Sequence, residues 1–172
     1  MKDDILFYEK QSFWRNRLLI IILIPVNAIV IWGFVQQIIS GNAWGDNPMN
    51  NLGLIVKMGG LLLISVILFL SKLKTIITEE GVYIRLLPFA LKTRFFAWED
   101  IEEAYVRRYR PLREYGGWGV RLGWKGGIAY NVYGNIGLQL VFNNGKKLLI
   151  GTNRAEELAE VLKKINGKRE QK

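Results

Sequence analysis

The sequence predicts a membrane α-helical hairpin followed by a mainly-β domain of about seven antiparallel strands capped by a C-terminal α-helix. Three observations support this prediction. Two long hydrophobic runs lie before residue 72, and half of all residues are hydrophobic. Short segments with period-two alternation and intervening turn residues follow those runs. The last segment repeats apolar residues at helical spacing.

The first membrane helix is expected at 18–39, a run that contains no charged residue. A helix of that length is about 33 Å long, which is enough to cross a bilayer core of about 30 Å. Pro25 lies inside the run and is tolerated in membrane helices. Asn27 can hydrogen-bond either the second helix or its own backbone. Residues 1–17 are interpreted as a short amphipathic cytoplasmic segment that leads into this helix.

The second membrane helix is expected at 52–71, where Lys57 is the only charge between residues 52 and 70. The stem of Lys57 is long enough to carry its amine to the membrane interface. The alternative is a functional charge inside the membrane.

The distribution of charge around the two runs predicts their orientation. The connecting loop, 40–51, contains one acid and no basic residue, whereas Arg15, Arg17 and Lys72 flank the hairpin. The positive-inside rule therefore places both termini in the cytoplasm and the loop outside the cell membrane. A cleaved signal peptide is disfavoured, because the first run is longer than a signal h-region and no small-x-small site follows it.

A cytoplasmic domain is expected at 73–166. Turn residues separate its candidate strands, and Asn144-Gly145 is a strong hairpin signal because both residues tolerate positive φ. The candidate strands are 73–78, 82–86, 93–98, 102–110, 120–124, 128–133, 138–142 and 146–151.

The chain is expected to end in an amphipathic helix. Asn153 and Glu156 have the spacing of a capping box, and Thr152 is an alternative cap. Gly167 is expected to end the helix and leave 167–172 as a flexible tail. The apolar stripe of this helix comprises Ala155, Leu158, Ala159, Leu162 and Ile165.

This order of strands and one final helix resembles the pleckstrin-homology (PH) superfold. The segment Trp98-Glu99-Asp100-Ile101 resembles the W-x-D-I region of bacterial PH-like membrane proteins, in which two membrane helices often precede the domain. The glycine-containing stretches at 117–121, 134–137 and 149–152 are similar as well. The resemblance covers roughly residues 53–166 and implies a PH-like fold. Its motifs are structural, so it carries no active site to this chain.

The composition argues against most enzymatic chemistry. The chain contains neither Cys nor His, so a thiol nucleophile, a zinc or haem site and a histidine base are excluded or disfavoured. We expect no enzyme activity, no metal and no cofactor. The acidic group Glu99, Asp100, Glu102 and Glu103 is interpreted as a solvated turn.

Positive charge is concentrated after the hydrophobic runs. The net charge is +9, and 19 basic against 11 acidic residues from residue 72 onward account for +8. One reading is a site for an anionic lipid headgroup or phosphate. The other is a solvated basic face that discourages pairing of strand edges. Nucleic acid is disfavoured, because no nucleic-acid motif is present. The candidate contacts are Arg107, Arg108, Arg110, Arg113, Arg121 and Lys125.

Two functional hypotheses follow. The first is a membrane-anchored cytoplasmic PH-like binding or scaffold module, which engages a protein partner or a second copy and is aided by anionic lipid. The second is an accessory subunit of a membrane transport or export complex, in which Asn27 and Lys57 are intramembrane polar residues that line a path.

Overall fold

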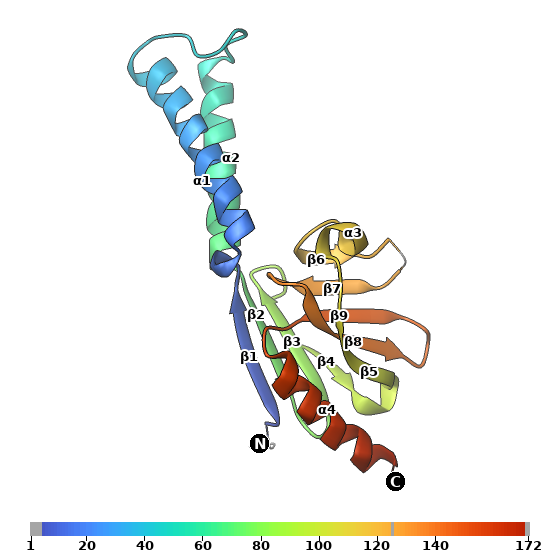
Figure 1. Ribbon diagram of the computed structural model, residues 1–172. Helices are drawn as coiled ribbons and strands as arrows, with labels where there is room; N and C mark the ends of the chain where they lie inside the picture. The colour runs from blue at the N-terminus through green and yellow to red at the C-terminus, as the bar shows by residue number, and fades with distance from the viewer. Residues whose placement is uncertain (1–4, 125, 171–172) are drawn as a thin grey trace.

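A computed structural model describes residues 5–124 and 126–170, and it has two parts: a helical hairpin and a β-rich domain (Figure 1). The hairpin comprises α1 (Arg17–Phe34), the π-helical segment η2 (Val35–Ile39) and α2 (Asn51–Leu70). A short 3-10 helix, η1 (Phe13–Arg15), precedes α1. The two long apolar helices that the sequence predicts are therefore confirmed.

Asparagine side chains begin both helices of the hairpin. The Asn16 Oδ1 atom accepts a hydrogen bond from the Leu19 N–H at 3.2 Å. The Asn50 Oδ1 atom accepts one from the Gly53 N–H at 2.7 Å. Both satisfy N–H groups that have no partner within the helix, which fixes where each helix starts.

The first sheet has the order β1-β2-β3-β4, with all neighbours antiparallel. Its strands are β1 (Phe7–Ser12), β2 (Lys72–Ile77), β3 (Gly81–Leu87) and β4 (Arg94–Ala97). The hairpin is inserted between β1 and β2, which pair from Phe7↔Ile77 to Ser12↔Lys72.

The second sheet has the order β5-β8-β9-β7-β6. The short helices η3 (Trp98–Asp100) and α3 (Pro111–Tyr115) precede β5 and β6. The strand pair β7·β9 is parallel, and the other pairs are antiparallel. Its strands are β5 (Ile101–Arg108), β6 (Gly119–Leu122), β7 (Ile128–Asn131), β8 (Ile136–Phe142) and β9 (Lys147–Gly151).

The core lies between the two sheets and the final helix, α4 (Ala155–Glu170). Leu158, Leu162 and Ile165 of α4 are buried against the sheets, as the helical stripe predicts. The indole of Trp98 is also buried, and its Nε1 atom donates to the Thr78 carbonyl at 3.0 Å. The coarse expectation of a mainly-β region with a C-terminal helix is therefore confirmed.

Several details differ from the sequence prediction. Residues 7–12, predicted to belong to a separate lead-in segment, form β1 at the edge of the first sheet. The predicted all-antiparallel arrangement is wrong for β7 and β9, because alternation along a strand carries no information about the direction of its partner. Gly167 does not end the last helix, which continues to Glu170.

Strand β1 does not show the alternation of apolar and polar residues expected of a strand, because some of its buried residues are polar. Phe7, Glu9 and Gln11 alternate as its buried positions, and two of them are polar. The Glu9 carboxylate accepts hydrogen bonds from the Thr152 hydroxyl at 2.6 Å and the Asn153 N–H at 2.9 Å. The Gln11 Nε2 atom donates to the Gly151 carbonyl at 2.6 Å. These bonds join β1 to the segment that leads into α4.

Replacing Glu9 should therefore destabilise the β domain. We expect Glu9→Ala to lower the free energy of unfolding by about 1–3 kcal/mol, because it leaves buried donors near Thr152 without an acceptor. Chemical denaturation of the detergent-solubilised chain measures this. Lys10→Ala, on the exposed side of the same strand, is the matched control. Equal stability of the two variants would contradict the role assigned to Glu9.

Candidate functional site

The candidate site lies where β5 ends and α3 begins. Pro111 occupies the first turn of α3, where its missing N–H is no loss. Gly116 ends the helix with a left-handed φ of 66° that favours glycine. The α3 helix thus lies inside a segment predicted from the sequence to be a loop between strands, and it displays Leu112 and Arg113 on the surface.

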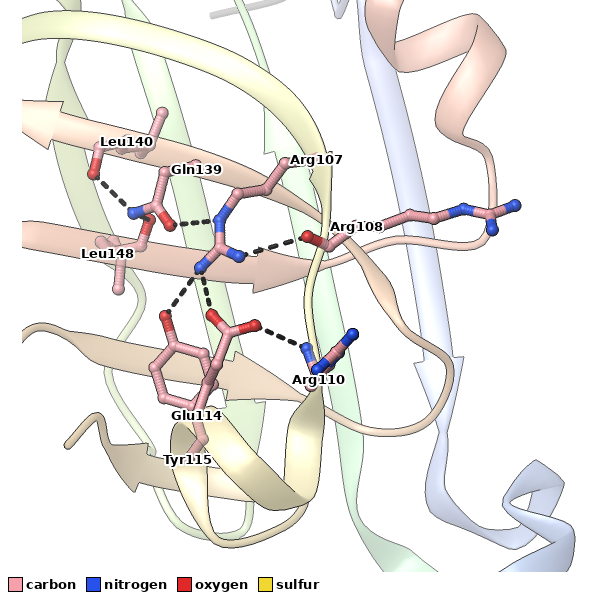
Figure 2. A network of polar contacts seen from close by, with 8 residues as sticks. All are labelled: Arg107, Arg108, Arg110, Glu114, Tyr115, Gln139, Leu140 and Leu148. Atoms are coloured by element: carbon pink, nitrogen blue, oxygen red, sulfur yellow. Dashed lines mark hydrogen bonds and ion pairs between the residues drawn. The ribbon is translucent and has the colours of Figure 1, made fainter. Parts of the chain in front are cut away.

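The side chain of Arg107 is held by a network of polar contacts (Figure 2). Its Nη2 atom forms an ion pair with Glu114 Oε2 at 2.8 Å, and its Nε atom donates to Gln139 Oε1 at 3.0 Å. Nη2 also donates to the Tyr115 hydroxyl at 3.4 Å, and Nη1 donates to the Arg108 carbonyl at 3.2 Å. Arg107 therefore attaches α3 to β5 and β8.

The network extends into the sheet and to the start of α3. The Gln139 amide donates to the carbonyls of Leu140 and Leu148, both at 3.2 Å. The second carboxylate oxygen of Glu114 accepts from the Arg110 N–H at 2.7 Å. Because Gln139 is bonded on both sides, it presents its oxygen to Arg107 in one orientation.

Charge and burial compete in this network. Burial alone would lower the pKa of Arg107 and raise that of Glu114. The hydrogen bond and attraction between the two outweigh burial, so the pKa of Arg107 is raised and that of Glu114 is lowered. Burial raises the pKa of Tyr115, and it raises that of Tyr109 to about 12. Both phenols therefore stay neutral at pH 7, and Glu114 is the carboxylate that pairs with Arg107.

Two hollows border the polar network around Arg107. Arg107, Glu114 and Tyr115 line one with a volume of about 310 Å³, together with Arg113 and Lys147. Arg110, Leu112, Arg113, Trp118 and Asn135 line the other, which is more open and has a volume of about 450 Å³. Arg113 borders both hollows. Arg110, the residue before α3, borders the second one.

Two of the predicted arginines, Arg108 and Arg121, line neither hollow. Figure 2 shows the side chain of Arg108 directed away from Arg107 and Glu114. Arg121 is exposed on β6, and its Nε atom donates to the Trp118 carbonyl at 3.0 Å. Lys125 lies outside the described residues. The structure thus separates one structural arginine, Arg107, from Arg110, Arg113 and Arg121, whose guanidinium groups border solvent.

Asn27 and Lys57 lie in the helical hairpin. The Asn27 Nδ2 atom donates to the Leu23 carbonyl at 2.7 Å and to the Ser65 hydroxyl at 2.9 Å. Both alternatives for Asn27, its own backbone and the second helix, are therefore realised together. The side chain of Lys57 is exposed on α2.

Glu114 and Gln139 are members of the network that were not predicted from the sequence. Glu114 follows Pro111 by three residues, a spacing that could have indicated an acid in the first turn of a short helix. Gln139 gave no such signal, because its role depends on the pairing of β8 with β5. Among the residues described, no three Asp or Glu side chains converge on a possible metal site.

The ion pair makes the attachment of α3 sensitive to acid. A lowered carboxylate pKa adds stability that is fully present above the ordinary value of 4.5 and is lost as the pH falls through the lowered pKa. Glu114→Gln should therefore lose up to about 1 kcal/mol at pH 7 and show a shallower fall in stability in acid. Denaturation as a function of pH measures this, with Glu103→Gln at an exposed position of β5 as the control. Parallel profiles for wild type and Glu114→Gln would contradict the assignment.

Comparison with known proteins does not assign this site. No family model matches the chain, and no match is found among curated proteins.

Proposed function

We propose that this chain is a membrane-anchored binding module whose helical hairpin spans the cell membrane and whose PH-like β domain lies at the cytoplasmic face. The observation that carries the proposal is the exposure of the hairpin. Only 11% of the apolar stretch of the first helix and 6% of that of the second are buried. Side chains such as Ile21, at 69% exposed, contact neither the β domain nor the other helix extensively. A lipid bilayer is the environment that removes such a surface from water.

The attachment of the hairpin argues against both a soluble core helix and a cleaved signal sequence. A core helix of a water-soluble protein would be mostly buried, and these helices extend away from the β domain (Figure 1). Cleavage after α1 as a signal sequence would remove β1, whose Phe7 belongs to the core. A permanent hairpin is consistent with the intact first sheet.

The same attachment supports one orientation. Ser12 pairs with Lys72, so the chain enters and leaves the hairpin at adjacent points of one sheet. Both ends of the hairpin must then lie on one side of a membrane. Arg15, Arg17 and Lys72 lie at that end, and the positive-inside rule favours the cytoplasm for it.

We propose that the β domain is not catalytic and holds a protein partner, or a second copy of the chain, near the membrane. The lack of Cys and His supports a binding role over acid–base or thiol chemistry. Strand β4 is a free edge of the first sheet among the described strands, and Phe95 on it is 46% exposed. An edge strand with an exposed aromatic residue is suited to contact another chain.

The orientation can be tested with single cysteines, because the chain contains none. We expect Asn47→Cys, in the loop between η2 and α2, to react with a membrane-impermeant maleimide in intact cells. Lys163→Cys, on the exposed face of α4, should react only after permeabilisation. The reverse labelling pattern would show that the β domain is outside, and labelling of both sites in intact cells would contradict the hairpin.

The binding role can be tested by photocrosslinking in native membranes. Probes at Phe95 and Arg108 should each give a discrete crosslinked protein band, whereas a probe at Asn47 should not give it. A band containing another protein identifies an adaptor, and a band containing only this chain identifies a homo-oligomer. A lack of bands from both domain probes would contradict the binding role.

One observation favours the second candidate, an accessory subunit of a transport or export complex. Asn27 and Ser65 face a groove of about 490 Å³ on the hairpin that is otherwise lined by apolar residues such as Leu62 and Phe69. The same crosslinking assay separates the candidates. If the chain is a binding module, the double variant Asn27→Leu and Lys57→Leu keeps the Phe95 crosslink. If the chain is a transport subunit that requires these polar residues, the double variant loses the crosslink.

A further inference from the structure

The β domain exposes several large apolar side chains on α3, at the end of β6 and in the loop between β3 and β4. Leu112 on α3 is 63% exposed, Leu122 at the end of β6 is 78% exposed and Trp124 is 81% exposed. Phe89 and Leu91, between β3 and β4, are exposed as well. We call these five residues the apolar rim.

Two residues of the rim, Phe89 and Leu91, lie beside the base of the hairpin. Leu87 pairs with Lys72, the second residue after α2, so the loop that carries Phe89 and Leu91 starts next to the end of α2. The Asn16 Nδ2 atom donates to the Val132 carbonyl at 3.1 Å, which joins the start of α1 to the end of β7. Leu122 pairs with Ile128 at the start of β7, so it lies at the other end of this strand from Val132. Figure 1 shows α3 and β6 on the side of the β domain from which the hairpin also extends.

Backbone hydrogen bonds fix the chain at Trp124. The Trp124 N–H donates to the Glu114 carbonyl at 3.1 Å, and the Gly123 N–H donates to the Gly127 carbonyl at 2.9 Å. Glu114 is fixed in turn by Arg107, so α3 and the loop after β6 are joined. An exposed tryptophan on a bonded loop keeps its indole in water unless another surface covers it.

Arginines lie near two residues of the rim, Leu112 and Leu122. Arg110 and Arg113 line the open hollow beside Leu112 and Trp118, and Arg121 lies between Val120 and Leu122 on the exposed strand β6. Tryptophan, leucine and arginine together are typical of surfaces that lie in the headgroup layer of a membrane. An anionic lipid surface matches this charge and is already adjacent to the hairpin base.

We infer that the apolar rim inserts into the headgroup layer of the bilayer that the hairpin crosses, with Arg110, Arg113 and Arg121 contacting lipid phosphates. This inference rests on the membrane anchoring proposed above. It gives the β domain a second attachment and fixes its tilt relative to the membrane. The face that carries β4 and Phe95 then remains available for a partner.

Depth measurements on the full chain in vesicles test this. Leu122→Cys and Leu112→Cys are labelled with a polarity-sensitive fluorophore, with Lys163→Cys as the control in water and Ile24→Cys as the control inside the membrane. Vesicles contain phosphatidylcholine alone or with phosphatidylglycerol, and some contain a lipid that carries a shallow quencher. We expect both rim labels to shift to the blue and to be quenched more strongly with phosphatidylglycerol, while the Lys163 label stays unchanged.

Charge reversal separates the contribution of the arginines. In the Leu122→Cys background, Arg110→Glu, Arg113→Glu and Arg121→Glu together should abolish the difference between the two lipid compositions. Added salt should weaken that difference in the unreversed chain through screening. An unchanged difference after charge reversal would overturn the contacts with phosphate.

The controls distinguish the ways in which the inference can fail. Rim labels as polar as the Lys163 label, with the Ile24 label protected, would overturn the inference and leave the anchoring intact. A polar Ile24 label would overturn the anchoring as well. Protection of the rim labels that varies with protein density and not with lipid charge would show that a second copy covers the rim, and this result would also overturn the inference.

Discussion

The pairing of β1 with β2 constrains everything else in this molecule. These strands adjoin in the sheet, yet 59 residues lie between Ser12 and the Lys72 that pairs with it. The hairpin must therefore leave and return at neighbouring points. The Phe13 N–H donates to the Ser71 carbonyl at 3.2 Å, and Ser71 is fully buried. The base of the hairpin is thus continuous with the core, and no flexible linker separates the two described parts.

A second constraint comes from Arg107. Its contacts with Glu114 and Gln139 hold α3 against the second sheet, so the side chain of Arg107 has a structural role. A guanidinium with this many partners has few donors left for a ligand. The Glu114 carboxylate that pairs with Arg107 also accepts from the Arg110 N–H, so the same ion pair holds the start of α3 beside the open hollow. Arg107 therefore has a structural role, and the proposed lipid contacts are assigned to its neighbours.

Two groups of exposed apolar side chains bear on the proposed membrane attachment. The larger group belongs to the hairpin, and the smaller group forms the rim of the β domain. Both parts face in the direction of the proposed membrane, whereas the core of the domain is formed by the two sheets and α4. In the proposed arrangement, a single bilayer would shield both surfaces, and the arginines near the rim would contact its anionic headgroups.

The sequence by itself determined the two apolar helices, most strands and the final helix, because each rests on a local period or on an uninterrupted hydrophobic run. It also located the cluster of arginines. Only the tertiary structure decided that residues 7–12 are a strand, because Glu9 and Gln11 look solvent-facing until Gly151, Thr152 and Asn153 provide their partners. It also decided which arginine is structural, since the Gln139 that fixes Arg107 lies 32 residues away in the chain. Local periodicity depends on neighbouring residues, but the satisfaction of a buried polar group depends on distant ones.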